Sequence, residues 1–178
     1  VEQVLQEIQE IFPDDMLHLG CDELKFHCWT QVQTWMNRHH FEVKDTFGYF
    51  LRRITSKLNK TVIVWQEALE ATRGLPATAL VETWKCWAHQ HERAAEEAKR
   101  RGLRVIDASC WYLDWASSLR DFENKRLLPY WHGAEAASWT EHMDHSNFEC
   151  RVFPRLFAVA QVAWTGQHIP LPSVDWLI

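Results

Sequence analysis

Short β-branched runs alternate with amphipathic helical segments along this chain, and this alternation is the feature that most constrains its fold. The clearest run is TVIVW at residues 61–65, and the segment 88–101 has the apolar spacing of a helix that Gly102 ends. The predicted strands are residues 16–20, 61–65, 79–84, 103–108 and 135–139. The predicted helices are residues 1–12, 29–38, 45–58, 88–101 and 151–164. Strands that alternate with helices predict an α/β fold, with a parallel sheet and the helices outside it.

Acidic and aromatic residues gather where the predicted strands end. They are Asp22, Glu23, Trp65, Glu67, Glu82, Trp84, Tyr112, Asp114, Trp139 and Glu141. In a (β/α)8 barrel, residues from the carboxyl ends of separate strands converge on the active site. A whole barrel needs eight strands and about 250 residues, so a chain of 178 residues predicts a partial (β/α)8 TIM barrel, about the last five strands with their helices. Residues 1–178 are therefore expected to be the carboxyl-terminal part of a TIM-barrel catalytic domain whose amino-terminal strands are absent.

Composition narrows the possible partners. The formal net charge is −5, which leaves no basic surplus for a nucleic acid backbone. No apolar run approaches the roughly 18 residues of a membrane span, so neither a nucleic acid nor a membrane partner is expected. Eleven tryptophans are several times what an ordinary chain of this length carries, and they favour a pocket that stacks on sugars or nucleotides.

The cysteines and histidines do not indicate a metal site. The five cysteines form no CxxC pair, and their odd number cannot complete a disulfide framework inside this chain. The histidine pairs at 89/91 and 142/145 do not have the His-Glu-x-x-His form of a helical zinc site. We therefore expect no bound metal.

Two adjacent carboxylates, Asp22 and Glu23, follow the first predicted strand. Neighbouring carboxylates drive their proton affinities apart, so that one acts as an acid while the other stays ionised. Glycoside hydrolysis needs an acid for the leaving oxygen and a second group that stabilises the oxocarbenium-like centre. The first turn of a helix also favours acidic residues, so the dipeptide by itself leaves both interpretations open.

The residues around this pair resemble a known family. FPDDMLHLGCDELKFHCW, residues 12–29, resembles the signature of glycoside hydrolase family 20, the β-N-acetylhexosaminidases, whose pattern is His-x-Gly-Gly-Asp-Glu. Further matching segments follow in order, namely VIVWQEAL (62–69), LVETWK (80–85), WYLD (111–114), GAEAASWTE (133–141) and RVFPR (151–155). The resemblance spans residues 1–166 and implies an exo-β-N-acetylhexosaminidase that needs no cofactor. Its substrate would be terminal β-linked GlcNAc or GalNAc on glycoconjugates or chitooligosaccharides.

The resemblance also implies a role for each site residue. Catalysis would be retaining and substrate-assisted: the 2-acetamido oxygen attacks the anomeric carbon and forms an oxazolinium intermediate. Glu23 would be the general acid and base, Asp22 would hold the acetamido N–H, and Tyr112 would bond the acetamido oxygen. The substrate-binding residues would be Trp65, Trp84 and Trp139 as pocket walls, and Asp114 and Glu141 as acceptors for the 4- and 6-hydroxyls.

Several features depart from the family pattern or extend it. Cys21 replaces the second glycine of the signature, at a turn where a glycine is often needed for its backbone freedom. Cys28 resembles a family disulfide cysteine whose partner lies upstream, so we expect it to be unpaired. The family arginine that grips the sugar also lies upstream, so the isolated chain is expected to be weakly active or inactive.

The same resemblance predicts a cellular address. Asn59-Lys60-Thr61 is an N-glycosylation acceptor just before a predicted strand. It agrees with the lysosomal or secreted localisation that the family implies. The full-length form is expected to be a homodimer.

Two alternatives remain open from the sequence. The chain could belong to another retaining barrel glycosidase with an enzymic carboxylate nucleophile, for which Glu67 or Glu141 is the candidate. It could also be a non-catalytic sugar-binding fragment or pseudoenzyme that keeps the tryptophan pocket without turnover. Thiazoline inhibitors, which mimic the oxazolinium intermediate, should bind tightly only to a substrate-assisted enzyme.

Overall fold

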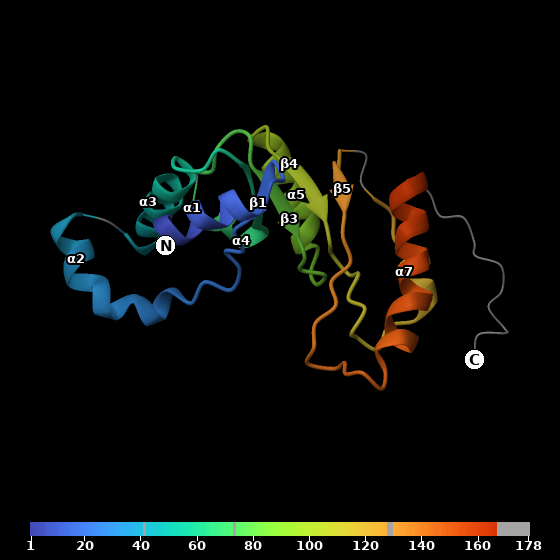
Figure 1. Ribbon diagram of the computed structural model, residues 1–178. Coiled ribbons are helices and arrows are strands. Elements are labelled where there is room, and N and C mark those ends of the chain that lie inside the picture. The colour runs from blue at the N-terminus through green and yellow to red at the C-terminus, as the bar shows by residue number, and fades with distance from the viewer. Residues whose placement is uncertain (41, 73, 128–129, 167–178) are drawn as a thin grey trace. The chain divides into compact units, whose positions relative to one another are not determined.

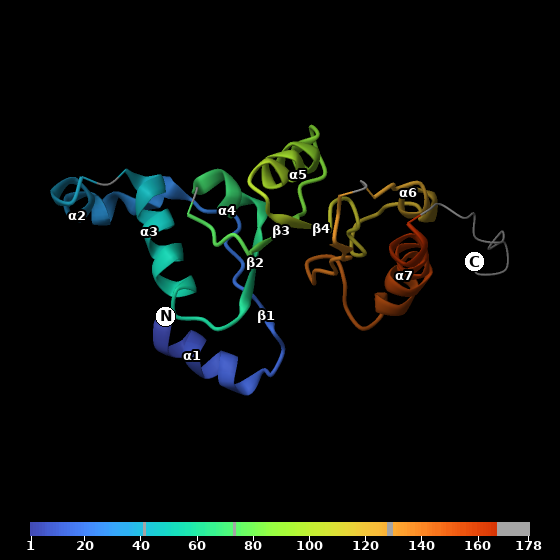
Figure 2. The same ribbon diagram turned by 90° about the horizontal axis from the view of Figure 1, so that it is seen from above.

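The computed structural model describes residues 1–40, 42–72, 74–127 and 130–166. The chain divides into two compact units, whose elements are labelled in Figures 1 and 2. Unit 1 comprises residues 1–83 and 89–105, and unit 2 comprises residues 84–88 and those from 106 onward.

Unit 1 contains three parallel strands in chain order. They are β1 (Met16–His18), β2 (Thr61–Trp65) and β3 (Leu80–Thr83). Leu17 pairs with Val62, and Val64 pairs with Val81. The helical elements are α1 (Glu2–Ile11), the 3-10 helix η1 (Phe26–Val32), α2 (Gln33–Arg38), α3 (Val43–Thr55), α4 (Gln66–Ala71) and α5 (Gln90–Arg100). The apolar core of this unit includes Leu51, Ile54, Val62, Val64, Leu69, Val81 and Ala95.

Unit 2 is organised around its last helix. Strand β4 (Arg104–Asp107) begins in unit 1, ends in unit 2 and pairs in parallel with β5 (Gly133–Ala134). Helix α6 (Leu119–Glu123) begins with a capping box between Ser118 and Asp121 and contacts α7 (Phe148–Thr165). The buried cluster under α7 consists of Trp111, Leu113, Phe122, Val152, Ala158, Val159 and Val162.

The strand order in the sheet is β1-β2-β3-β4-β5, and the paired strands run parallel. Parallel neighbours joined by helices are the repeating unit of a (β/α)8 barrel. The predicted fold class, α/β with five strands of a partial barrel, is therefore confirmed. No helix in the described part of the chain is long and apolar enough to cross a membrane.

The prediction of a last strand over residues 135–139 is wrong. The strand is Gly133–Ala134, and beyond it the ladder is interrupted until Ala137 forms an isolated parallel bridge with Tyr112. The segment GAEAASW contains no β-branched residue, and small side chains contribute little to a pleated surface. The pairing is therefore held by backbone bonds at single residues, such as Leu113 N–H to the Ala137 carbonyl at 2.8 Å.

Three further differences concern unit 1. The strand predicted at 16–20 spans only Met16–His18 and is largely exposed, because β1 lies at an edge of the sheet. The helix predicted at 29–38 begins three residues earlier as a 3-10 helix and becomes α-helical at Gln33. Helix α4 was not predicted, since its six residues follow β2 without an intervening turn signal.

Candidate active site

The turn after β1 carries Asp22 and Glu23 and has an unusual backbone. Gly20, Cys21 and Glu23 have φ angles of 72°, 79° and 47°, in the left-handed region that side chains disfavour. Both carboxylate side chains are exposed. Strained backbone of this kind persists only where its surroundings hold it, and it clusters at functional sites.

His18 holds the start of this turn. Its Nδ1 accepts a hydrogen bond from the Gly20 N–H at 3.0 Å, so the ring proton lies on Nε2, which donates to Glu82 Oε2 at 3.0 Å. The Glu82 side chain is only 1% exposed and lies on β3. The imidazole also contacts Trp65 edge-on, with 4.9 Å between ring centroids. From the sequence, Glu82 was predicted only as a strand-end acid and His18 had no predicted role, although His18 is the first residue of the signature.

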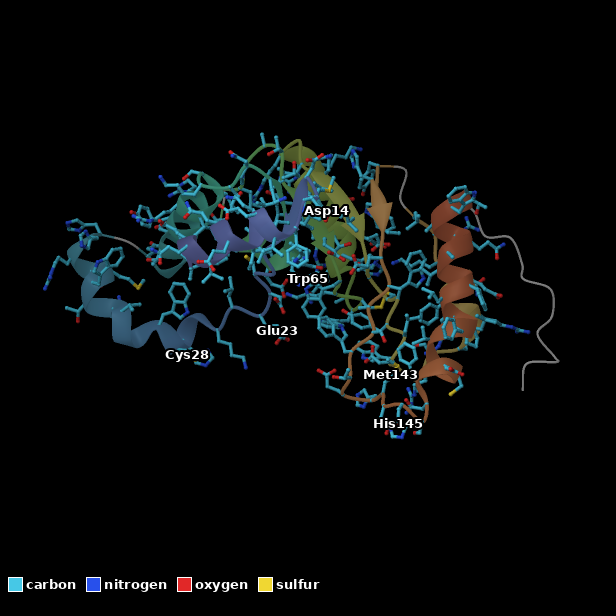
Figure 3. All side chains as sticks on the ribbon, viewed as in Figure 1. Asp14, Glu23, Cys28, Trp65, Met143 and His145 are labelled. Carbon is cyan, nitrogen blue, oxygen red and sulfur yellow. A yellow bond between two sulfur atoms is a disulfide. The ribbon has the colours of Figure 1, made fainter. Side chains whose placement is uncertain are left out.

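Strand β2 supplies the next supports. The Trp65 N–H donates to the Gly20 carbonyl at 2.8 Å, which ties the end of β2 to the turn. Glu67, in the first turn of α4, is 8% exposed and its Oε1 accepts from the Glu23 N–H at 3.4 Å. Glu23 and Trp65 are labelled in Figure 3. Three predicted site residues, Asp22, Glu23 and Trp65, are thus brought together in unit 1.

Cys21 is a thiol rather than a thiolate in this turn. Burial, with a smaller contribution from the charge of Asp22, raises the pKa of its thiol to about 11. A thiol with a raised pKa is a poor nucleophile and a poor metal ligand. Cys21 therefore contributes its shape to the turn and not its reactivity.

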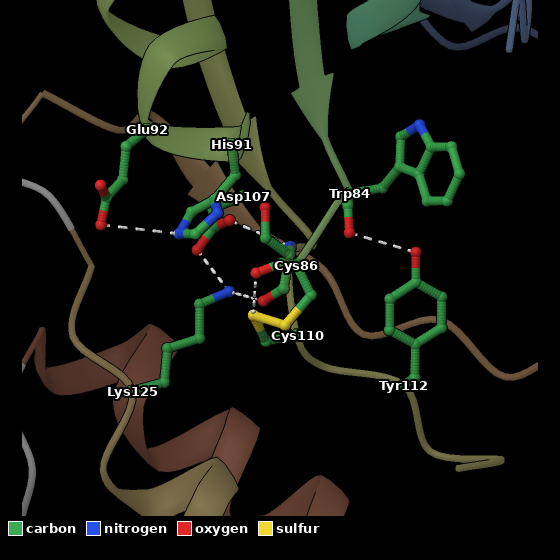
Figure 4. The surroundings of a disulfide bond; sticks show 9 residues. Trp84, Cys86, His91, Glu92, Asp107, Cys110, Tyr112 and Lys125 are labelled. Atoms are coloured by element: carbon green, nitrogen blue, oxygen red, sulfur yellow. Dashed lines mark hydrogen bonds and ion pairs between the residues drawn. A yellow bond between two sulfur atoms is a disulfide. The ribbon is translucent and has the colours of Figure 1, made fainter. Parts of the chain in front are cut away.

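Tyr112 and Trp84 meet in unit 2. The Tyr112 hydroxyl donates to the Trp84 carbonyl at 3.2 Å, as Figure 4 shows, and the residue is 5% exposed. Its ring stacks on Trp115, with centroids 4.4 Å apart and an interplanar angle of 14°. The indole of Trp84 packs edge-on against Trp87. Two aromatic pairs, Tyr112–Trp115 and Trp84–Trp87, are thus linked through the Trp84 carbonyl, and Trp87 and Trp115 had no predicted role from the sequence.

Asp114 is brought to Trp139. Its Oδ1 accepts from the Trp139 N–H at 3.2 Å, and the residue is 2% exposed. The guanidinium of Arg151, on α7, donates to the Asp114 carbonyl at 2.6 Å and fixes its backbone. The indole of Trp139 is 48% exposed, and Glu141 lies exposed two residues beyond it.

A disulfide joins Cys86 to Cys110, with 4.8 Å between Cα atoms. This disulfide was not predicted from the sequence, because five cysteines without a recognisable spacing allow many pairings. Cys21, Cys28 and Cys150 are free thiols, and Cys28 is exposed. Figure 4 shows the bridge between the segments that carry Trp84 and Tyr112.

A buried ion pair joins Lys125 to Asp107, three residues before Cys110. Lys125 Nζ is 2.5 Å from Asp107 Oδ2, and the two side chains are 9% and 0% exposed. The ammonium also donates to the Ser109 carbonyl and lies 4.2 Å from the centroid of the Trp111 ring. Burial lowers the pKa of Lys125, and the charge of Asp107 opposes that effect.

Asn59 lies in the turn before β2 with its side chain exposed, and its N–H donates to Gln9 Oε1 at 3.1 Å. Within the described residues, no three His, Cys, Asp or Glu side chains are grouped as a metal ion would require.

Comparison with known proteins first supports the fold. A solved β-N-acetylhexosaminidase from Bacteroides fragilis superposes with a TM-score of 0.77 at 22% identity, covering 98% of this chain and 40% of that one. This agreement places the chain among the (β/α)8-barrel proteins.

The family follows from the sequence comparisons. The model of glycosyl hydrolase family 20, catalytic domain, matches residues 1–132 and 123–167, so the chain belongs to this family. The β-hexosaminidase subunit β of Homo sapiens is 30% identical over 184 residues, covering 92% of this chain and 33% of the relative. The subunit β of Felis catus is also 30% identical, covering 95% of this chain and 35% of the relative. The chain thus spans about a third of the length of these relatives.

Proposed function

We propose that residues 1–178 form the carboxyl-terminal part of the catalytic domain of an exo-β-N-acetylhexosaminidase. The observation that carries the proposal is the Asp22–Glu23 pair on a left-handed turn at the end of β1, in a chain of this family. The proposed reaction releases terminal β-linked GlcNAc or GalNAc from glycoconjugates or chitooligosaccharides with retention of configuration.

Glu23 is the proposed general acid, which protonates the glycosidic oxygen and later activates water as the base. Its side chain is exposed, while its backbone N–H is bound by Glu67. This bond orients the turn through the main chain and leaves the Glu23 carboxyl available to substrate. Asp22 is proposed to accept the acetamido N–H and to stabilise the positive charge of the oxazolinium ring.

Tyr112 is proposed to bond the acetamido oxygen. A phenol has one proton to donate, and here it points at the Trp84 carbonyl. Rotation about the C–O bond would redirect it to the acetamido oxygen when the sugar binds. The oriented acetamido group would then attack as an intramolecular nucleophile at high effective molarity.

The remaining residues are proposed to hold the sugar. Trp65, Trp84 and Trp139 are half-buried or exposed indoles, as walls of an acetamido and sugar pocket require. Asp114 and Glu141 are proposed acceptors for the 4- and 6-hydroxyls. The Trp139 N–H bound to Asp114 would hold one of these acceptors at a constant position.

Two leaving groups test the role of Glu23. In the Glu23→Gln variant of the full-length protein, hydrolysis of an aryl β-GlcNAc with a poor leaving group should fall about 100- to 10,000-fold. A dinitrophenyl glycoside, which leaves without protonation, should lose much less in the step that forms the oxazolinium ion. Glu10→Gln, an exposed carboxylate on α1, is the matched control and should match the wild type. Equal losses for both leaving groups would contradict the assignment.

A lysosomal or secreted localisation is proposed for the whole protein. The Cys86–Cys110 disulfide supports it, because disulfides persist in oxidising compartments. The exposed Asn59 acceptor supports it as well. Digestion of the secreted protein with an endoglycosidase should lower its mass, and Asn59→Gln should reduce that change by the mass of one glycan. The homodimer stays a prediction, which sedimentation of the full-length protein would test.

A further inference from the structure

The disulfide of unit 2 is centred between two residues with proposed roles at the sugar. Cys86 lies two residues after Trp84, and Cys110 lies two residues before Tyr112. Their Cα atoms are 4.8 Å apart, so the bridge holds the two segments in contact. Neither cysteine has a role in the proposed chemistry.

A hydrogen bond between the two segments determines where the Tyr112 proton points. The hydroxyl donates to the Trp84 carbonyl at 3.2 Å, while stacking on Trp115 fixes the plane of the ring. A shift of the Trp84 backbone would remove this acceptor. The resting orientation of the phenolic proton therefore depends on the position of a main-chain atom two residues from Cys86.

The segment of Tyr112 is anchored independently of the bridge. Asp107 Oδ1 accepts from the Ser109 N–H at 3.0 Å, and the buried Lys125 binds both Asp107 and the Ser109 carbonyl. The next residue, Cys110, has a φ of 65°, a backbone conformation that a side chain disfavours. Residues 107–110 thus form a fixed base, to which the disulfide attaches the Trp84–Ala88 segment.

We propose that Cys86 and Cys110 are positioning residues for Tyr112. Their disulfide fixes the Trp84 carbonyl against the Tyr112 hydroxyl, so that the phenol is held one rotation away from the acetamido oxygen. The part of this inference that concerns the acetamido oxygen rests on the proposed function. The part that concerns the position of Tyr112 does not.

A double-mutant cycle separates positioning from general stability. In the full-length protein, the variant Cys86→Ala/Cys110→Ala should lower kcat on an aryl β-GlcNAc by on the order of ten- to 100-fold with little change in KM. In a Tyr112→Phe background the same pair of substitutions should change kcat less than about twofold, because the residue through which they act is gone. Equal losses in both backgrounds would overturn the proposal. Cys150→Ala, a free thiol of the same unit, is the matched control.

A second measurement does not depend on activity. The chain has three tyrosines, so 3-fluorotyrosine labelling should give one fluorine resonance for each within this chain, and Tyr112→Phe assigns the one from Tyr112. In the disulfide-free variant this resonance should shift or broaden while those of Tyr49 and Tyr130 stay in place. An unchanged Tyr112 resonance would overturn the proposal even if the variant were less active. If the full-length wild type hydrolyses no β-GlcNAc, the proposed function fails, and the fluorine spectrum still decides the positioning role.

The disulfide-free variant could fail to fold, and reduction of the folded protein then replaces it. A phosphine reductant followed by alkylation opens the bridge, and peptide mapping shows which cysteines are modified. The Tyr112 resonance should change in parallel with alkylation of Cys86 and Cys110. A resonance that stays in place at full alkylation would refute the inference.

Discussion

Replacing Lys125 with methionine tests whether the buried ion pair stabilises unit 2. Methionine keeps much of the length of the side chain but removes the charge, so Asp107 is left as a carboxylate that is 0% exposed and has lost its cation. Breaking a buried pair in this way costs about 3–5 kcal/mol. In a protein of this size each kcal/mol lowers the melting temperature by about 2–4 °C. The Lys125→Met variant should therefore melt roughly 6–20 °C lower than the wild type.

Two further variants make the origin of the loss testable. The double variant Lys125→Met/Asp107→Asn should recover much of the lost stability, because asparagine is neutral and can still accept from the Ser109 N–H. Arg53→Met, which breaks an exposed pair with Glu2, is the control and should leave the melting temperature nearly unchanged. A loss below about 1 kcal/mol for Lys125→Met, measured by denaturant titration, would refute the reasoning.

Four further predictions concern the turn after β1. Since burial raises the pKa of Cys21 to about 11 from an ordinary 9.0, its alkylation by iodoacetamide at pH 8 should be about 100-fold slower than that of an ordinary thiol; labelling at that ordinary rate would contradict the burial. The stabilisation of the folded state by the protonated Cys21 thiol should be complete below pH 9 and lost as the pH rises through 11. Melting curves measured across this pH range would reveal the loss. Cys21→Gly should raise the free energy of unfolding by up to about 1 kcal/mol, since glycine adopts a φ of 79° without strain, and a lower melting temperature would argue against that strain. Glu67→Gln keeps an acceptor for the Glu23 N–H and should cost about tenfold or less in kcat, whereas a loss near a millionfold, with rescue by azide, would identify Glu67 as a nucleophile.

The elements that sequence analysis located well are those with a strong local signal. The run TVIVW is β2 to the residue, and the apolar spacing before Gly102 predicted α5. The last strand was misplaced because GAEAASW has no local preference for extended structure, and its pairing is decided by partners such as Asp107 and Tyr112. Helix α4 was missed for the opposite reason: a strand signal and a helix signal adjoin without a turn between them.

The candidate site also contains features that local motifs predict and features that only the structure shows. Asp22, Glu23 and Tyr112 were predicted as site residues from short motifs, which can be read in a single sequence without an alignment. The Cys86–Cys110 disulfide and the Lys125–Asp107 pair join residues 24 and 18 positions apart through the fold. No spacing rule connects them, so only the structure reveals that the segment of Tyr112 is anchored twice.

The support of the Asp22–Glu23 turn shows why a cysteine can replace the glycine of the signature. The left-handed conformation of a residue with a side chain costs about 1–2 kcal/mol, and it survives only if neighbouring contacts exceed that cost. Here three independent hydrogen bonds reach the turn: from Gly20 to His18, from Trp65 to Gly20, and from Glu23 to Glu67. All of these residues belong to unit 1. Since the buried Glu82 in turn accepts a hydrogen bond from His18, the position of the turn that carries the proposed acid depends on residues of β1, β2 and β3.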